Sequence, residues 1–176
     1  MNEVDWILKR RSIRKFSGQA PSDEQITKML EAAMAAPSAL NLKPWKFIVV
    51  QDQERLAELR KALPFGKMMA PCAIVVCGDL RWFKKPAMER FWVQDCSAAT
   101  QNILLAAVSL RLGAVWCGVH PISRLEKPVG KTLGIPEGVV PLNVIFIGTP
   151  AEEKPARTQY SDKNVYSDKF GHPWKG

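Results

Sequence analysis

The hydrophobic positions of this chain follow two patterns, a helical period in some segments and short continuous runs in others. After Ser22, apolar residues return every three or four positions, which predicts an amphipathic helix that ends before Pro37. Ser22 and Gln25 form a capping box at its start. The apolar stripe expected to face inward consists of Ile26, Met29, Leu30, Ala33 and Met34.

Short runs of β-branched and apolar residues predict strands, and periodic segments between them predict further helices. The expected strands cover residues 46–51, 73–77, 114–119 and 142–148. The further helices are expected over residues 3–9, 53–62, 95–112 and 123–133. The helix over 95–112 is apolar nearly all round, so it must be buried on several sides, and Gly113 is expected to cap it.

These elements predict an α+β fold, a small central sheet flanked by helices, in one domain that spans residues 1–176. The last part of the chain, residues 149–176, has no core periodicity. It nevertheless keeps more aromatic and apolar residues than a solvated tail usually does, so we expect it to pack on another surface. These residues are Tyr160, Val165, Tyr166, Phe170 and Trp174.

The overall composition is that of an ordinary soluble globular protein, with 47% hydrophobic and 24% charged residues. The four cysteines lie in apolar stretches and form no Cys-x-x-Cys pair, which indicates reduced core residues in a cytoplasmic protein. No signal-peptide pattern occurs near Met1, and the longest apolar run, residues 103–110, is too short to span a membrane. We therefore expect no membrane partner.

The formal net charge of +8 raises the possibility of a nucleic-acid-binding module. Five basic residues, however, fall within positions 9–15, and without them 20 basic residues stand against 17 acidic ones, a net charge of +3. A groove for a polyanion would spread basic residues over a whole face. The compact cluster favours a compact anion such as one phosphate, and no nucleic-acid partner is expected.

Several familiar nucleotide-binding and metal-binding motifs are absent, which reduces the number of reactions that the chain could catalyse. No Gly-x-Gly-x-x-Gly occurs, and the Gly-Lys-Thr at residues 130–132 lacks the upstream glycine of a phosphate-binding loop. The only histidines, His120 and His172, cannot build a zinc site with the scattered cysteines, so no metal is expected. A Cys–His nucleophile pair stays open. Otherwise any redox chemistry must come from a bound cofactor.

Residues 10–16 read Arg-Arg-Ser-Ile-Arg-Lys-Phe, which alternates donors suited to phosphate with apolar anchors. Guanidinium groups are permanently charged and forked, so they match phosphate oxygens, and the serine adds a neutral hydroxyl. Two or three such cations balance a phosphomonoester, whose charge at neutral pH is about −1.5 to −2. A solvated basic turn is the alternative interpretation.

Four segments of the chain occur together in one order. They are the run at 10–16; Pro-Ser-Ala-Leu-Asn at 37–41 with Pro-Trp at 44–45; Asp95, its helix and the run at 112–118; and Gly-x-Pro-x-Glu-x-Lys-x-x-Arg at 148–157. In this order and spacing they resemble the nitroreductase family of flavin mononucleotide (FMN) proteins. That resemblance implies a mostly antiparallel sheet and an interlocked homodimer, in which residues 150–176 wrap the partner subunit.

The resemblance also implies which residues bind the FMN cofactor. Arg10, Arg11 and Ser12 would hold its phosphate and ribityl chain, and Lys154 and Arg157 would complete the phosphate site. The partner subunit would bring three residues to the flavin: Pro37, Ser38 and Asn41.

Four more residues are expected around the flavin ring. Arg14 would reach its pyrimidine edge, and Lys67 would lie near N1 and O2. Cys117 and Gly118 would present backbone to the ring, with the Cys117 amide donating to N5. The sequence departs from the family pattern at Lys43, where glutamine is common, and at Gln159, where a second arginine is common.

The implied activity is a ping-pong oxidoreductase reaction, in which NADH or NADPH delivers hydride to FMN and a small acceptor, such as a nitroaromatic or a quinone, receives it. The aromatic residues of segment 80–93 are candidates for a substrate-facing lid, with core or dimer contacts as the alternative; they are Trp82, Phe83, Phe91 and Trp92. Other chemistry on the same fold also stays open, namely flavin fragmentation, dehalogenation, or flavin storage and sensing.

Overall fold

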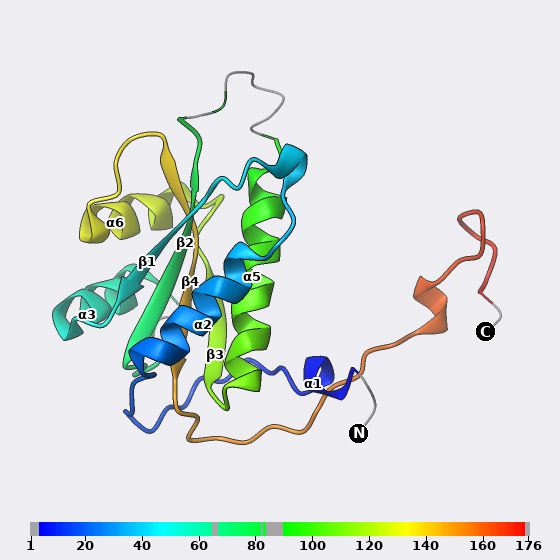
Figure 1. The fold of residues 1–176 in the computed structure, drawn as a ribbon, viewed down its shortest axis with the longest axis horizontal. Helices are drawn as coiled ribbons and strands as arrows, with labels where there is room; N and C mark the ends of the chain where they lie inside the picture. The colour runs from blue at the N-terminus through cyan, green and yellow to red at the C-terminus, as the bar shows by residue number, and fades with distance from the viewer. Residues whose placement is uncertain (1–3, 65–66, 82, 84–89, 175–176) are drawn as a thin grey trace.

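A four-stranded antiparallel sheet of order β1-β2-β4-β3 forms the centre of the protein (Figure 1), in a computed structural model that describes residues 4–64, 67–81, 83 and 90–174. Its strands are β1 (Trp45–Val50), β2 (Cys72–Asp79), β3 (Gly113–Gly118) and β4 (Val139–Gly148). The helices are α1 (Asp5–Leu8), α2 (Asp23–Met34), α3 (Gln53–Ala62), α5 (Trp92–Ser109) and α6 (Ser123–Leu133), with short 3-10 turns η1 (Ala39–Asn41) and η2 (Asp162–Asn164). The predicted α+β class and the antiparallel sheet are confirmed.

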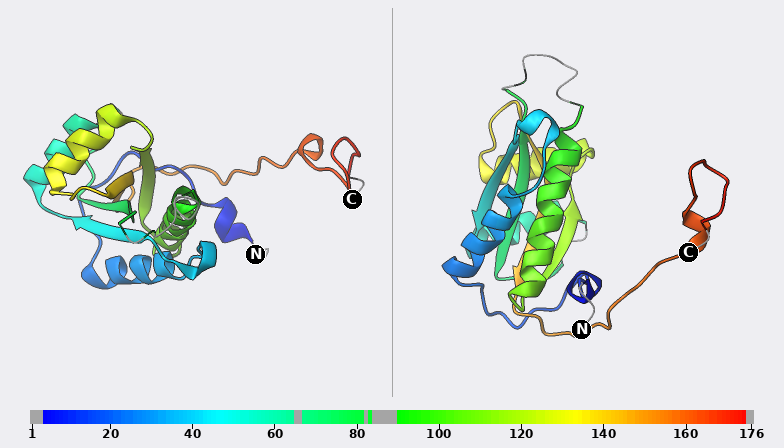
Figure 2. Two further views of the ribbon diagram at one scale, coloured as in Figure 1. Left: turned by 90° about the horizontal axis from the view of Figure 1, so that it is seen from above. Right: turned by 45° about the vertical axis from the view of Figure 1, so that its right-hand side comes forward.

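Helices cover both faces of the sheet, α2 and α5 on one and α3 and α6 on the other (Figure 2). Every residue of β2 is buried, as its unbroken apolar run predicts. Successive side chains alternate between the two cores: Ile74 and Val76 pack with α2 and α5, while Val75 and Cys77 pack with α3 and α6.

Helix α2 begins at the predicted capping box, in which the Ser22 and Gln25 side chains each bond the other residue's amide. Ile26, Met29 and Ala33 are buried against α5, but Met34 is 54% exposed, so its assignment to the inner stripe was wrong. At 100° per residue, Met34 lies at the edge of the stripe centred on Ala33 and Ile26.

Helix α5 starts at Trp92, three residues earlier than expected, and is buried or half-buried along most of its length. The predicted cap at Gly113 was wrong. Arg111 adopts the left-handed conformation after the helix, with φ 59°, and Gly113 is the first residue of β3. A Cβ at Gly113 would lie 2.7 Å from Cγ2 of Ile13, so glycine is required there by close packing.

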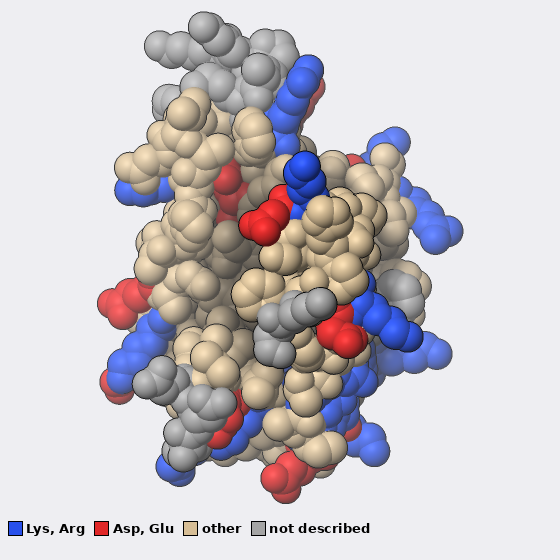
Figure 3. Space-filling view, turned by 90° about the vertical axis from the view of Figure 1, so that its right-hand side faces the viewer, with Lys and Arg blue, Asp and Glu red and all other residues tan. Residues whose placement is uncertain are grey.

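After β4 the chain runs back along residues 8–16 and then leaves the body of its own subunit (Figure 1, orange to red). Near its end a small turn brings the rings of Tyr166 and Phe170 to a centroid distance of 4.4 Å. Phe170 is 90% exposed. Viewed from the side to which this tail projects, uncharged side chains fill most of the middle of the molecule, with a few acidic and basic ones among them (Figure 3). Within the described residues, no helix is long and apolar enough to cross a membrane.

Candidate functional site

The basic segment, residues 9–15, lies along the outer edge of β3. Ser12 forms a parallel bridge with Ala114, and the Ile13 amide donates to the Ala114 carbonyl at 3.0 Å. On its other side the segment meets the chain that follows β4, where Phe16 bridges Pro150. The sequence therefore places its densest positive charge between a sheet edge and the start of the tail.

Glu152 holds this segment through its carboxylate. Its Oε1 accepts hydrogen bonds from the amides of Arg14 at 2.6 Å and Lys15 at 3.3 Å. The Lys154 ammonium lies 3.0 Å from the same oxygen and donates to the Ser12 carbonyl at 2.7 Å. The Arg14 amide is the largest of several donors that lower the pKa of Glu152 to about 2.

Two arginines extend this contact between the segment and the tail. The Arg11 guanidinium donates to the Pro155 carbonyl, and the Arg157 amide donates to the Leu8 carbonyl at 3.1 Å. The fold thus brings Lys154 and Arg157 beside the segment that carries Arg11, although Lys154 lies 142 residues from Ser12 in the sequence.

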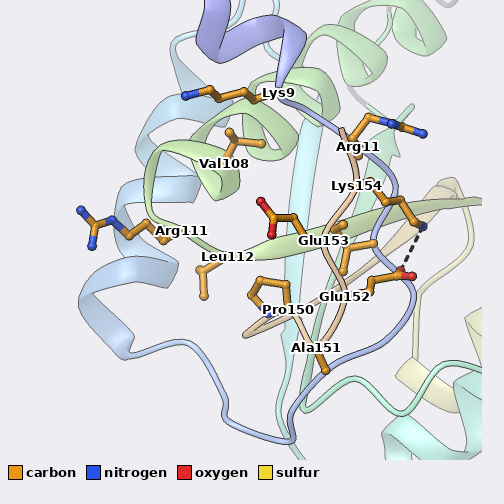
Figure 4. A pocket seen from close by; sticks show the side chains of 11 residues that line it. Lys9, Arg11, Val108, Arg111, Leu112, Pro150, Ala151, Glu152, Glu153 and Lys154 are labelled. Carbon is orange, nitrogen blue, oxygen red and sulfur yellow. Dashed lines mark ion pairs between the residues drawn. The ribbon is translucent and has the colours of Figure 1, made fainter. Parts of the chain in front are cut away.

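A groove of about 560 Å³ opens beside this segment (Figure 4). Arg11 and Lys154 line it, whereas Arg10, Ser12 and Arg14 do not. Glu153 reaches into the groove, so its lining carries both signs of charge. The other lining residues are Lys9, Ile13, Val108, Arg111, Leu112, Pro150, Ala151 and Glu152.

The outer edge of β3 presents backbone groups in alternation. The Ala114 carbonyl accepts from the Ile13 amide, so the backbone N–H and C=O groups of Ala114 point away from β4. Gly118 lies an even number of residues further along β3, so its backbone groups point the same way. Cys117 lies an odd number of residues from Ala114, so its amide points toward β4 rather than outward. Gly118 is exposed, with no atom within 4 Å of the position of a Cβ. The outward amide at this end of β3 therefore belongs to Gly118.

Cys117 is an inert thiol despite its place beside this edge. Burial raises its pKa to about 11, while the positive charge of Arg14 acts in the opposite direction. The guanidinium of Arg14 therefore lies near enough to the end of β3 to act on it electrostatically. The thiols of Cys72, Cys77 and Cys96 are also free and buried, as expected, and burial raises each of their pKa values to about 12.

The loop over residues 37–44 is held in an unusual conformation. The Ser38 hydroxyl accepts from the Lys43 amide at 3.0 Å, and the buried Asp95 carboxylate accepts from the Ala39 amide at 2.9 Å. Left-handed backbone at non-glycine residues is disfavoured and often marks functional loops. Three residues of this loop adopt it: Leu40, Asn41 and Lys43.

This loop and the basic segment lie at opposite ends of α5 (Figure 1). Asp95, which bonds the loop, is in the first turn of α5, whereas Leu112, which shares the groove with Arg11, follows its last turn. A helix of 18 residues is roughly 27 Å long at 1.5 Å per residue. Within one subunit, Pro37, Ser38 and Asn41 therefore do not meet Arg10–Arg14.

The remaining candidates lie apart from the segment. Lys67 is exposed, immediately before Met68, which packs in the core beside α3 and α6. Trp92 is only 6% exposed, with its ring over Gly78 and 4.8 Å from the ring of His120, so the structure gives it the alternative role of a core contact. Phe83 is partly buried against the same core as Trp92, Phe91 is 49% exposed, and Trp82 lies outside the described residues.

Two positioning side chains, Glu152 and Asp95, received no role from the sequence alone. Both lie inside the family-like segments, and both accept hydrogen bonds from backbone amides that are distant in sequence. For Glu152, the one signal available was its place as the glutamate of the Gly-x-Pro-x-Glu-x-Lys-x-x-Arg run. For Asp95, the signal was an acidic residue at the start of an otherwise apolar helix.

The chain is similar to known proteins over most of its length. The family model described as "Nitroreductase family" matches residues 7–64 and 65–149. A protein of Archaeoglobus fulgidus, provisionally named an NADH dehydrogenase/NAD(P)H nitroreductase, is 47% identical over 95% of this chain and 98% of its own.

Two solved structures are similar over almost their whole length. A protein of Parabacteroides distasonis, with the same provisional name, has a TM-score of 0.89 at 38% identity, covering 95% of this chain and 98% of that one. A provisionally assigned nitroreductase of Desulfovibrio desulfuricans, crystallised in complex with FMN, has a TM-score of 0.79 at 30% identity, covering 97% and 99%.

Proposed function

Because the chain belongs to the nitroreductase family, we propose that it is an FMN-dependent oxidoreductase that uses NADH or NADPH to reduce small organic acceptors, such as nitroaromatics or quinones. The observation that carries this proposal is the cationic segment fixed at the edge of β3 beside Lys154 and Arg157. The FMN complex of the Desulfovibrio relative supports the choice of cofactor.

The residues present fit an FMN phosphate and ring. Arg10, Arg11 and Ser12 supply two forked cations and a hydroxyl on one short segment, and Arg157 reaches the same segment from the tail. The outward Gly118 amide, with open space at its Cα, offers a backbone donor where a flat ring can approach closely. These are the groups that would hold the cofactor.

FMN, when bound, would supply the two-electron chemistry between the nicotinamide and the acceptor. Arg14 would stabilise negative charge on the reduced ring, and Lys67 is a second candidate for that role. We assign the backbone donor to the ring nitrogen N5 to the Gly118 amide instead of the Cys117 amide, because the alternation along β3 turns the Cys117 amide toward β4. A ping-pong mechanism follows if nicotinamide and acceptor occupy the same place in turn.

We further propose that the site is completed in a homodimer. Pro37, Ser38 and Asn41 lie one helix length from the basic segment of their own subunit, so a twofold partner is the natural source of these residues. The projecting tail supports the same arrangement, because an aromatic cluster led by Phe170 would otherwise remain in water. In this proposal residues 150–176 wrap the partner and residues 1–176 form one domain.

A cytoplasmic location is part of the proposal. Four free, buried thiols suit a reducing compartment. Thiol titration under denaturing conditions, done directly after lysis, measures the oxidation state of the four cysteines and so tests the cytoplasmic location.

The decisive experiment records the visible spectrum of the purified protein and follows nicotinamide oxidation with a nitroaromatic and with a quinone. We expect a yellow protein with bound FMN and acceptor-dependent oxidation of NADH or NADPH. A colourless protein that refuses added FMN would contradict the proposal. Stoichiometric FMN without nicotinamide oxidation would instead favour flavin storage or sensing.

A further inference from the structure

We propose that Glu152 is a positioning residue of the cofactor site, which holds the basic segment in its binding shape through the amides of Arg14 and Lys15. This inference rests on the proposed function, since it assigns Glu152 a role in FMN binding. It also changes the expected role of Lys154, which becomes part of the same support.

The backbone of the segment needs such a support. The segment is bridged to β3 at Ser12 and to Pro150 at Phe16, and the Lys15 carbonyl accepts from the Ala151 amide at 2.9 Å. For the amides of Arg14 and Lys15, the described residues give one acceptor, the Oε1 of Glu152. The bond to Arg14, at 2.6 Å, is short, as is usual for a carboxylate acceptor. One carboxylate on the tail, that of Glu152, therefore anchors the backbone of both Arg14 and Lys15.

Lys154 closes the support on the other side. Its ammonium lies 3.0 Å from the Glu152 carboxylate and donates to the Ser12 carbonyl at 2.7 Å. The ion pair of Glu152 and Lys154 therefore contacts the segment at Ser12 and at the amides of Arg14 and Lys15. The exposed fractions of the two side chains are 25% for Lys154 and 18% for Glu152. With two of its three donors engaged in this way, Lys154 acts on the segment before it acts on any phosphate.

Such a support matters because anion binding by flexible cations is weakened by the entropy of ordering them. A long, charged side chain loses about 0.5–1.5 kcal/mol when it is immobilised, and a preformed segment avoids part of that loss. The Glu152 carboxylate bonds two backbone amides and the Lys154 ammonium, so it fixes the shape of the segment without pairing with the guanidinium groups of Arg10 and Arg11. The geometry therefore favours a structural role for the ion pair of Glu152 and Lys154, here called the clamp, over simple balancing of the positive charge of the segment.

The test compares Glu152→Ala, Glu152→Gln and a matched control, Glu58→Gln. Glu58 is exposed on α3, away from the groove, and its replacement makes the same change in net charge as Glu152→Gln. Two quantities are measured for each protein: the Kd for FMN, by flavin fluorescence on titrating the flavin-free protein, and the exchange rates of the Arg14 and Lys15 amides, by NMR in the absence of FMN.

We expect Glu152→Ala to raise the Kd for FMN about tenfold or more, since loss of hydrogen bonds to a charged group is involved. Glu152→Gln keeps an acceptor and should lie between Glu152→Ala and the wild type. Glu58→Gln should stay within about twofold of the wild type. The Arg14 and Lys15 amides should exchange faster in Glu152→Ala than in the wild type, and their exchange rates should be unchanged in the control. Rescue by glutamine separates positioning from a general loss of folding, and Glu152→Gln against the control decides the matter if Glu152→Ala does not fold.

The double variant Glu152→Gln/Lys154→Met addresses the role of Lys154. If both residues belong to one clamp, the effect of the double variant on the Kd for FMN should be smaller than the sum of the effects of Glu152→Gln and Lys154→Met. Full additivity would return Lys154 to direct phosphate binding and contradict its place in the clamp. An unchanged Kd and unchanged amide exchange in Glu152→Ala would overturn the clamp itself while leaving the proposed function intact. Failure of the wild type to bind FMN would remove the proposed function, and with it the role of Glu152 in cofactor binding.

Discussion

Arg14 is held at its backbone and acts through its side chain. Its amide donates to Glu152 at 2.6 Å, and its guanidinium acts electrostatically on the end of β3, where Cys117 lies. A cation so placed can both bind an anionic cofactor and favour the reduced form of a ring beside it. Affinity and reduction potential therefore report on the same residue independently.

Arg14→Ala is expected to lower FMN content and also to make the midpoint potential of bound FMN more negative. Arg10→Ala should lower FMN content with a smaller effect on the potential, because its charge is assigned to the phosphate. Loss of a charge-assisted hydrogen bond weakens affinity by roughly ten- to a hundredfold. Arg124→Ala on α6 is the charge-matched control. Full flavin loading in Arg14→Ala would remove its assigned role.

The protonation of Glu152 gives a second prediction at this scale. Its pKa falls from an ordinary 4.5 to about 2 in the folded chain, chiefly through the Arg14 amide. A pKa lowered by folding stabilises the folded state fully above about pH 4.5, and that stabilisation is lost as the pH falls toward 2. The wild type should therefore lose melting temperature more steeply than Glu152→Gln over this window, while Glu58→Gln follows the wild type. Parallel curves for all three would contradict the assignment.

Single residues were also where sequence reasoning was most uneven. Arg10, Arg11 and Arg14 were conspicuous as a charge cluster, because like charges in a short segment need a counter-ion or water. Glu152 was not assigned, because its partners are backbone amides that come near only when the tail returns along the segment. A residue whose role is to accept from distant amides leaves no periodic or compositional pattern.

Among the elements, β3 shows most clearly how local chemistry and tertiary packing divide. Its apolar run predicted a strand, and the strand is present as Gly113–Gly118. The glycine at its start was misread as a helix cap, since the close approach of Ile13 that excludes a Cβ there is a tertiary contact. The same limit applies to Met34, whose exposure depends on where α5 crosses α2.

The two glycines at the ends of β3 should respond in opposite ways to alanine. Gly113→Ala places a Cβ 2.7 Å from the Ile13 side chain, so it should cost about 1–3 kcal/mol of stability and disturb the basic segment. Gly118→Ala has open space, so the flavin-free protein should keep its melting temperature while its affinity for FMN falls. Thermal melts of the flavin-free proteins and FMN titrations measure both. If Gly118→Ala bound FMN like the wild type, the ring would not approach this edge of β3.

At the scale of the whole molecule, one chain accounts for a sheet and two helical layers. The family resemblance anticipated the antiparallel sheet, and the sequence anticipated the buried α5. Neither could separate contacts within a subunit from contacts between subunits, because both use the same apolar residues. The structure adds the separation of the 37–44 loop from the basic segment along α5, on which the proposed dimeric site depends.

The tail carries the last prediction. Arg157 still contacts its own subunit through Leu8, whereas the aromatic residues beyond it project away from the body, so a chain ended after Thr158 keeps the intrasubunit contacts and loses the cluster around Phe170. If that cluster packs on a partner, the truncated protein should dissociate at concentrations where the full chain is dimeric, and it should lose FMN in the same range, because the loop from the partner leaves with it. Sedimentation velocity across a dilution series, read at protein and flavin wavelengths together, measures both events. The double variant Phe170→Ala/Trp174→Ala keeps the full length and separates loss of aromatic packing from loss of chain. A truncated protein that stays dimeric and fully loaded with FMN at every dilution would show that the tail does not hold the subunits together.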